Sequence, residues 1–290
     1  MIYHSMEELV REHRKAKETY VREPSCYAVE PFQIFGPVWY VGDQDVCLHL
    51  IDTGDGLILI DAGYPHTIHL TTESIWHLGF DPKDIRLIII THAHYDHIGC
   101  AMEYKRLYGC ELAMSRVDTE LMEAHPDLLL RNFSELEEII EVPEIDRKLE
   151  DGEHVRMGNI DIECRLIPGH TPGAMAFFFR VTEDGQKYYR AGLFGGAGIG
   201  SVRRVSLEYQ GFPLSLQQDM LDSLTRMADE RVELFLGNHE GNNHTLKRRE
   251  EQLAGNHEAF IRPGGWKAFL MRQKVRFEQT FAEERAYYGN

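Results

Sequence analysis

The chain has 290 residues, which suffices for two structural units of typical size or for one large layered domain. With 43% hydrophobic and 27% charged residues it has an ordinary globular composition, which excludes disorder as its main state. Its 31 Lys and Arg against 47 Asp and Glu give a net charge of −16, a field that repels nucleic-acid backbones and anionic membrane surfaces. We therefore expect neither nucleic acid nor membrane as a partner.

The first 16 residues carry charges throughout and contain no apolar run that precedes a cleavage site. Apolar stretches elsewhere fall far below the roughly 18 residues needed to cross a bilayer. We therefore expect no export signal and no membrane span, and a cytoplasmic location. An odd number of cysteines without CxxC spacing favours buried thiols over disulfides or a cysteine zinc site. The cysteines are Cys26, Cys47, Cys100, Cys110 and Cys164.

Residues 1–30 are expected to form a helical extension, and residues 31–290 a domain that includes a C-terminal helix. Four apolar runs separated by Gly, Pro and Asp predict a meander of antiparallel strands. These runs are residues 32–35, 38–41, 46–51 and 57–60. The pattern then predicts a helix over 65–80, a strand over 85–90 and a helix over 98–108, so this half has α/β layering.

The acidic residues 134–150 are expected to form a solvated connection to a second half of similar design. There, strands are predicted over 160–167, 174–181, 187–194 and 232–236, and helices over 213–227 and 264–284. The last helix places Trp266, Leu270, Phe277 and Phe281 along one face, which favours core packing. Two β-rich halves flanked by helices predict an α/β fold in four layers, an αββα sandwich.

The segment Thr91-His92-Ala93-His94-Tyr95-Asp96-His97 follows the strand predicted over 85–90 and precedes a helix. In an extended backbone His92 and His94 project to the same side, so both imidazoles can reach one metal ion. Asp96 and His97 begin the next turn and can face a neighbouring ion. Histidine nitrogen and carboxylate oxygen are ligands that zinc favours, and catalytic zinc sites keep one position open for water. The segment therefore predicts a catalytic zinc site.

Further ligands are expected at the ends of later strands. His170 lies in the rigid turn Pro168-Gly169-His170-Thr171-Pro172-Gly173, and His239 follows the strand predicted over 232–236. The tetrapeptide Gly-Asn-His-Glu occurs twice, so spacing alone does not choose between His239 and His257. The second copy follows a polar, helix-like stretch, which favours His239. The remaining histidines are interpreted as structural or surface residues.

These segments together resemble the metallo-β-lactamase superfamily. The resemblance rests on Leu57-Ile58-Leu59-Ile60-Asp61-Ala62-Gly63, the histidine-rich segment, Gly169–Gly173 and His239, and it spans roughly residues 31–245. It implies the αββα fold with one or two zinc ions in the cleft between the halves. It also implies that His92, His94 and His170 bind a first zinc, and that Asp96, His97 and His239 bind a second.

Asp61 matches the family's strand-end aspartate, which supports the ligand loop from behind. A carboxylate that caps the following Gly-Tyr-Pro turn is an equally good interpretation of Asp61.

The chain departs from the family pattern in residues 190–196, Arg-Ala-Gly-Leu-Phe-Gly-Gly. Many dinuclear members, including glyoxalase-like thioesterases, place a metal-bridging aspartate in such a stretch, and here there is no carboxylate. The pattern is therefore most similar to the third subclass of metallo-β-lactamases, whose second zinc is held by Asp, His and His. Those enzymes are normally exported, and residues 240–244 differ from the serine-bearing stretch that this subclass uses for the substrate carboxylate.

The resemblance implies a zinc-dependent hydrolase in which a metal-bound hydroxide attacks a carbonyl of a cyclic amide, lactone or ester. In this hypothesis Asp96 is the catalytic residue that orients the nucleophile, and the glycine-rich residues 195–200 let a small-molecule substrate approach. Arg203 or Arg204 could pair with a substrate carboxylate. The alternatives are a thioesterase or lactonase of small metabolites and a non-catalytic metal-binding sensor. A second copy of the chain is a further candidate partner, through exposed aromatic side chains.

Overall fold

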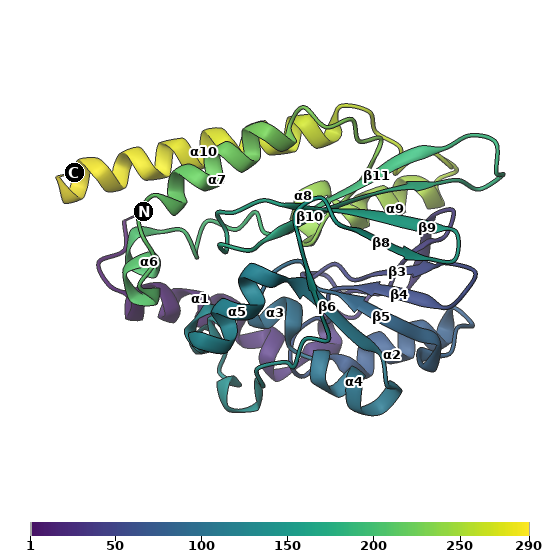
Figure 1. The fold of residues 1–290 in the computed structure, drawn as a ribbon, viewed down its shortest axis with the longest axis horizontal. Helices are drawn as coiled ribbons and strands as arrows, with labels where there is room; N and C mark the ends of the chain where they lie inside the picture. The colour runs from purple at the N-terminus through teal and green to yellow at the C-terminus, as the bar shows by residue number, and fades with distance from the viewer. Residues whose placement is uncertain (1, 290) are drawn as a thin grey trace.

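A computed structural model describes residues 2–289 and contains two β-sheets that pack face to face, with helices on the outer side of each (Figure 1). The sheets have seven and five strands in the orders β1-β2-β3-β4-β5-β6-β7 and β12-β11-β10-β9-β8. The predicted four-layer αββα sandwich is thus confirmed.

The first sheet combines an antiparallel meander, β1 to β4, with parallel strands from β4 to β7. Its strands are β1 (Phe32–Phe35), β2 (Val38–Tyr40), β3 (His49–Asp52), β4 (Leu57–Ile60), β5 (Ile85–Ile89), β6 (Glu111–Ser115) and β7 (Arg147–Leu149). The helices of this half are α1 (Met6–Arg22), α2 (Ile68–His77), α3 (Tyr95–Ile98), α4 (Ala101–Tyr108) and α5 (Arg116–Ala124). The meander predicted from the four apolar runs is present.

The second sheet is antiparallel except for its β11–β12 pair. Its strands are β8 (His154–Met157), β9 (Ile160–Leu166), β10 (Met175–Val181), β11 (Tyr189–Phe194) and β12 (Leu234–Leu236). Its helices are α6 (Arg204–Gln210), α7 (Leu216–Met227), α8 (Glu240–Asn243), α9 (Thr245–Leu253) and α10 (Gly265–Tyr288). Short 3-10 helices are η1 (Pro24–Tyr27), η2 (Pro82–Asp84), η3 (Pro126–Leu129), η4 (Arg131–Phe133) and η5 (Glu137–Ile139).

Three element predictions need correction. The helix predicted over 98–108 begins only at Ala101 as α4, because Ile98 ends the short helix α3 and Gly99 and Cys100 lie between the two. The strand predicted from residue 46 begins at His49, because residues 43–46 form a turn in which Asp43 Oδ1 accepts hydrogen bonds from the amides of Asp45 and Val46. Residues 134–150 are more than a solvated connection, since their end forms β7 and pairs with β6.

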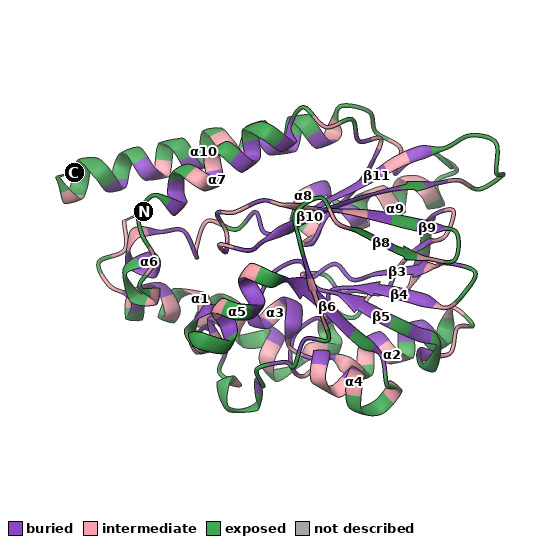
Figure 2. Ribbon diagram, viewed as in Figure 1, coloured by how far each residue is buried: buried purple, intermediate pink, exposed green. Residues whose placement is uncertain are grey.

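Buried side chains form a core between the sheets and one beneath each helical layer, as the burial colours of Figure 2 show. Ile58, Ile60, Phe177 and Leu193 belong to the core between the sheets. Under α10 the predicted stripe is buried as expected, with Trp266, Leu270, Phe277 and Phe281 at most 1% exposed. Cys26 is exposed, and the other four thiols are buried, as predicted for most of them.

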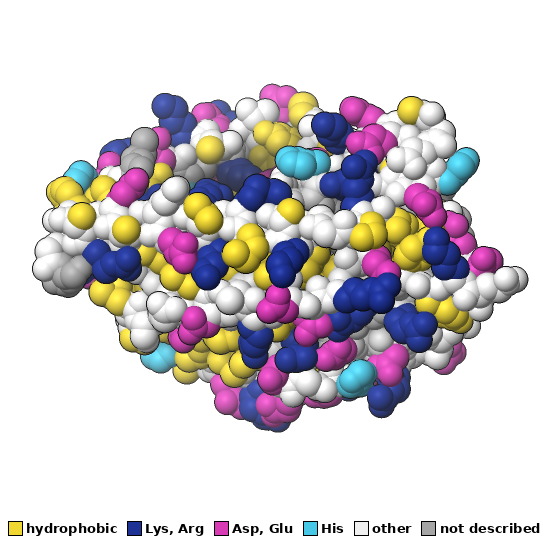
Figure 3. Space-filling model, turned by 90° about the horizontal axis from the view of Figure 1, so that it is seen from above, with side chains coloured by type: hydrophobic (Ala, Val, Ile, Leu, Met, Phe, Trp, Pro, Cys, Tyr) yellow, Lys and Arg dark blue, Asp and Glu magenta, His cyan; other side chains and the backbone are white. Residues whose placement is uncertain are grey.

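Helix α1 packs against the first half of the domain, and Ser5 caps its N-terminus with a hydroxyl that accepts a hydrogen bond from the Glu8 amide. Tyr20, near its end, is fully buried. On the face seen in Figure 3, acidic and basic side chains are interspersed, with apolar side chains between them. None of the helices within residues 2–289 has the length and apolar character that crossing a membrane requires.

Candidate metal centre

The histidine-rich segment leaves the end of the buried strand β5 and leads into the short helix α3. His92 and His97 are fully buried and His94 is 4% exposed. The His92 and His94 rings lie on the same side, as predicted, with centroids 4.6 Å apart. The loop at the end of β5 is fixed by its buried neighbours, and it therefore holds several imidazoles close together.

His92, His94 and His170 form a group that we call the first cluster. His94 Nδ1 lies 3.0 Å from His170 Nε2, and the His92 and His170 rings are 4.6 Å apart. Two nitrogens bound tetrahedrally to one zinc at about 2.0–2.1 Å would lie about 3.3 Å apart. His92 Nδ1 contacts Thr91 Oγ1 at 3.0 Å, whereas its buried Nε2 has no hydrogen-bond partner within residues 2–289. A buried nitrogen of this kind fits a metal ligand.

Burial keeps the histidines of the first cluster neutral, the form that binds metals. It lowers the pKa of His170 to about 4 and the pKa values of His92 and His94 well below the usual range. The neighbouring imidazoles act in the same direction at His92 and His94, because a charge on one disfavours a charge on the next.

Asp96, His97 and His239 form the second cluster. His97 Nε2 lies 3.2 Å from His239 Nε2, and Asp96 Oδ2 lies 3.4 Å from His239 Nε2. Burial alone would lower the pKa of His239, but Asp45 and Asp96 outweigh it and raise this pKa to about 10. The position therefore attracts positive charge. The His92 and His97 rings are 4.2 Å apart, so the two clusters are neighbours.

All six predicted ligands are thus brought together in two groups of three, and the exposed His257 of the second Gly-Asn-His-Glu copy is not among them. Within residues 2–289, these two are the only groups of three or more His, Cys, Asp or Glu side chains close enough to share an ion. Neither includes a residue of 190–196. Ala191 and Leu193 pack instead into the core between the sheets.

Asp61, at the end of β4, holds the ligand loop. Its Oδ1 accepts a hydrogen bond from the Thr91 amide at 2.7 Å, and its Oδ2 accepts from Thr91 Oγ1 at 2.9 Å and from His97 Nδ1 at 2.8 Å. A carboxylate that accepts from Nδ1 leaves Nε2 of His97 to face the second cluster. Asp61 therefore supports the ligand loop rather than capping the turn that follows it.

The buried carboxylate of Asp118, on α5, joins the two loops of the first cluster and was not predicted. It accepts hydrogen bonds from the Ala93 amide at 3.0 Å, from Thr171 Oγ1 at 2.6 Å and from the Gly173 amide at 2.6 Å. Burial raises its pKa to about 6 in spite of these bonds. A single aspartate that follows a strand carries no sequence signal for such a role.

The glycine-rich residues 195–200 pack against His170. Gly198 O accepts a hydrogen bond from His170 Nδ1 at 2.8 Å, and Ser201 Oγ lies 2.9 Å from the same nitrogen. Gly196 has φ +101°, and a Cβ there would lie 2.4 Å from Cδ2 of His170. A side chain at position 196 would therefore clash with His170. Approach of substrate along the loop stays a prediction.

The two arginines predicted to meet substrate are engaged by carboxylates. Arg203 is 8% exposed, and its Nη1 lies 3.2 Å from Glu284 Oε1 on α10. Arg204 Nε lies 2.7 Å from Glu208 Oε1. Their pairing with substrate stays a prediction, and for Arg203 it would require that a buried ion pair open.

The fold and its paired clusters are those of an αββα protein with side chains that could hold metal ions, and comparisons with known proteins find the same fold. The family model described as "Metallo-beta-lactamase superfamily" matches residues 48–183. Hydroxyacylglutathione hydrolase GloC of Haemophilus influenzae is 31% identical over 120 residues, which cover 38% of this chain and 53% of that protein. The chain spans about half or less of the length of the curated relatives that it matches first.

Solved structures match over nearly the whole chain. BJP-1, a subclass B3 metallo-beta-lactamase of Bradyrhizobium japonicum, is 26% identical with a TM-score of 0.81, and the match covers 92% of this chain and 99% of BJP-1. Native FEZ-1 from Legionella gormanii, at 24% identity and a TM-score of 0.78, shares the fold; the match covers 91% of this chain and 98% of FEZ-1. Residues 48–183 therefore match the metallo-beta-lactamase superfamily, the chain as a whole shares the metallo-beta-lactamase fold, and its structural neighbours include a subclass B3 enzyme.

Proposed function

We propose that this protein is a zinc-dependent hydrolase that cleaves a carbonyl substrate: a cyclic amide, a lactone or an ester. The observation that carries the proposal is the pair of adjacent clusters, in which six ligand-type side chains from three separate segments converge at one edge of the sandwich. Zinc in such a site polarises a carbonyl oxygen and lowers the pKa of water toward about 7.

In this proposal each cluster holds one zinc, and the surrounding residues orient the ligands. Gly198 and Ser201 fix the ring of His170, and Asp61 fixes the ring of His97. Asp96 keeps a partly exposed carboxylate, 16% accessible, in the otherwise buried ligand segment. If the second cluster holds zinc, Asp96 Oδ2, which faces His239, would be the ligand oxygen, and Oδ1 would be left to accept a hydrogen bond from a water molecule. That bond would orient the water toward the substrate carbonyl.

The substrate class has three candidates. The likeness to BJP-1 along almost its whole length favours a β-lactam, and the sequence likeness to GloC favours a thioester such as an acylated glutathione. The absence of a carboxylate in residues 190–196 favours the first over the second, because it matches the Asp-His-His set of the subclass B3 pattern. A lactone has the same reacting carbonyl and remains the third candidate.

The proposal is tested on purified protein whose zinc content is measured by elemental analysis. Hydrolysis of a chromogenic β-lactam, an acyl-homoserine lactone and an acylated glutathione is followed in parallel. The Asp96→Ala variant removes the assigned carboxylate, and the Asp229→Ala variant removes an exposed surface aspartate as a matched control.

Two bound zinc ions with β-lactam turnover that is lost in Asp96→Ala and kept in Asp229→Ala would support the lactamase-like activity. Turnover of the lactone or thioester alone would keep the mechanism and change the substrate class. Two bound zinc ions without turnover of any substrate would favour the metal-binding sensor. Protein that binds no zinc would refute the ligand assignment.

A further inference from the structure

A chain of contacts leads from helix α1 to the second cluster. Lys17 of α1 forms an ion pair with Asp45 Oδ2, and the Tyr64 hydroxyl donates to the same oxygen at 2.7 Å. Asp45 in turn contacts His239: its backbone oxygen lies 3.2 Å from His239 Nδ1 and its Oδ1 lies 3.5 Å away. The opposite ring nitrogen, His239 Nε2, faces Asp96 and His97.

We propose that Lys17 is a positioning residue for the second cluster, acting through Asp45 on His239. The inference rests on the proposed zinc site and concerns the strength with which the second cluster binds its ion. It gives α1, which lies outside the matched residues 48–183, a part in the metal centre.

The first step of the argument is the proton on His239. A carbonyl oxygen can only accept, so the contact with Asp45 O requires that Nδ1 of His239 carry a hydrogen. The nitrogen left for a metal ion is then Nε2, which points at Asp96 and His97. Removing an outer hydrogen-bond partner of a ligating histidine typically weakens metal binding about 10- to 100-fold.

The second step is what holds Asp45. Its backbone is fixed by Asp43 Oδ1, which accepts the Asp45 amide at 2.8 Å, and by the Glu240 amide, which donates to Asp45 O at 2.9 Å. Its carboxylate is held by Lys17 and Tyr64, and Lys17 supplies the compensating positive charge. Without Lys17 the Asp45 carboxylate would lose its ion-pair partner and would be free to turn toward solvent, away from His239.

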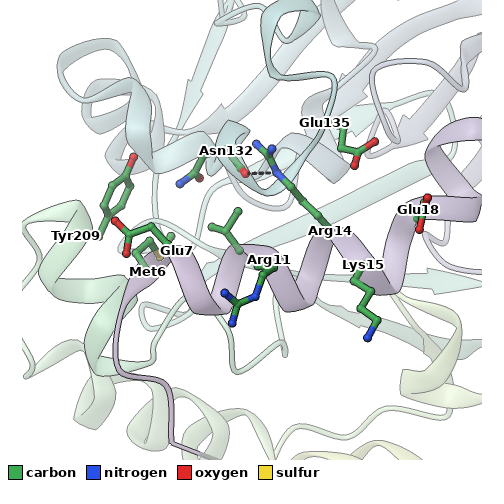
Figure 4. Close-up of a pocket in the computed structure, with 10 residues that line it drawn as sticks. Met6, Glu7, Arg11, Arg14, Lys15, Glu18, Asn132, Glu135 and Tyr209 are labelled. Atoms are coloured by element: carbon green, nitrogen blue, oxygen red, sulfur yellow. Dashed lines mark hydrogen bonds between the residues drawn. The ribbon is translucent and has the colours of Figure 1, made fainter.

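Helix α1 contacts two residues that adjoin the second cluster, Asp45 and Tyr95, from one face. One turn before Lys17, His13 Nε2 lies 2.9 Å from the hydroxyl of Tyr95, the residue that precedes Asp96. A different face of α1 lines a groove of about 590 Å³ between α1, η4 and α6 (Figure 4). There Arg14 Nε donates to Asn132 O at 2.9 Å, and Lys15 extends away from that bond. Lys15 therefore offers a matched control on the same helix.

The test measures zinc affinity by competition with a chromophoric chelator in the wild type and in Lys17→Met, Asp45→Asn and Lys15→Met. Asp96→Ala serves as a reference that identifies which binding step belongs to the second cluster. We expect about tenfold weaker binding at the second cluster in Lys17→Met and Asp45→Asn, the lower end of that range because the backbone contact with His239 Nδ1 remains, and unchanged binding at the first cluster. Lys15→Met should match the wild type at both, and Lys17→Arg should restore most of the affinity.

Cobalt(II) substitution supplies a signature that a merely structural role would not change. The absorption bands assigned to the second cluster should change in Lys17→Met, and those of the first cluster should not. If Lys17→Met does not fold, Tyr64→Phe removes the other hydrogen bond to Asp45 Oδ2 and leaves α1 intact.

Wild-type protein that binds two zinc ions, together with unchanged second-cluster affinity in Lys17→Met and Asp45→Asn, would overturn this inference and leave the proposed function standing. An equal loss at both clusters would also overturn it, because it would indicate general disturbance. Wild-type protein without zinc would refute the proposed function itself.

Discussion

Replacing Asp61 by Asn separates the stability of the metal-free protein from its affinity for metal. Asp61 has a left-handed backbone, φ +64°, that Asn adopts about as readily, so the main chain should not move. The amide oxygen can take the position of Oδ1 and keep the bond from the Thr91 amide. The amide NH₂ then takes the position of Oδ2, opposite His97 Nδ1 at 2.8 Å.

Without metal, the variant can keep a hydrogen bond between residue 61 and His97. The hydrogen of His97 moves to Nε2, and Nδ1 then accepts a hydrogen bond from the new NH₂ group. The Thr91 hydroxyl can turn to His92 Nδ1, 3.0 Å away. Zinc binding needs the opposite form of His97, in which Nε2 is bare. Two buried donors would then face each other, at a cost of roughly 1–3 kcal/mol. That range corresponds to about 5- to 150-fold in affinity.

We therefore expect Asp61→Asn to melt within about 2–4 °C of the wild type without metal, a shift equivalent to about 1 kcal/mol. Its second cluster should bind zinc about 5- to 150-fold more weakly in chelator competition. Asp52→Asn, at the end of the neighbouring strand β3, makes the same charge change away from the clusters and should alter neither quantity. Unchanged zinc affinity in Asp61→Asn would refute the reasoning about His97.

Three further outcomes are expected. Gly196→Ala should weaken zinc binding at the first cluster at least tenfold in the same competition assay, since its Cβ would displace His170, while Gly200→Ala, with open space around it, should not. Burial lowers the pKa of His49 from 6.5 to about 4. Its contribution to the free energy of unfolding is therefore complete above pH 6.5, and up to about 3 kcal/mol of it is lost as the pH falls toward 4. His49→Gln can still donate to Gly237 O, and its free energy of unfolding, measured by denaturant titration, should fall less between pH 6.5 and 4 than that of the wild type. An equally large fall in the variant would contradict this. A ligand that binds only the folded state raises the melting temperature as its free concentration rises. The melting temperature should therefore be lowest with a chelator present and should rise with added free zinc. A melting temperature independent of zinc would argue against binding.

The ligands could be located from the sequence because each lies directly after an apolar strand. A strand end fixes where a side chain emerges, so the contiguous His92–His97 segment and the rigid turn at His170 were sufficient to predict convergence. The choice of His239 over His257 followed from the same rule, since only His239 has a buried strand before it. In the structure the segment His92–His97, the turn at His170 and His239 lie together in the two clusters.

The residues that hold the ligands could not be located in this way, because their contacts join distant parts of the chain. Asp118 meets Ala93 and Gly173 across 25 and 55 residues. Strand β7 was missed for a related reason: of its three residues only Leu149 is buried, so hydropathy gives no strand pattern, and its pairing with β6 defines it.

The two clusters differ in where their supports come from, and this difference bears on how the family's chemistry can vary. The first cluster is held by Asp118 and by the loop of Gly198 and Ser201, all close to the sheets. The second has His97 held from within the domain by Asp61, but His239 held by a turn at Asp45 that α1 braces through Lys17. Both residues of that brace lie before residue 48, where the family match begins. A relative that lacks only such a helix would keep the first cluster's supports and lose part of the second's. The brace from α1 thus offers a physical route by which members of one fold come to bind one metal ion or two.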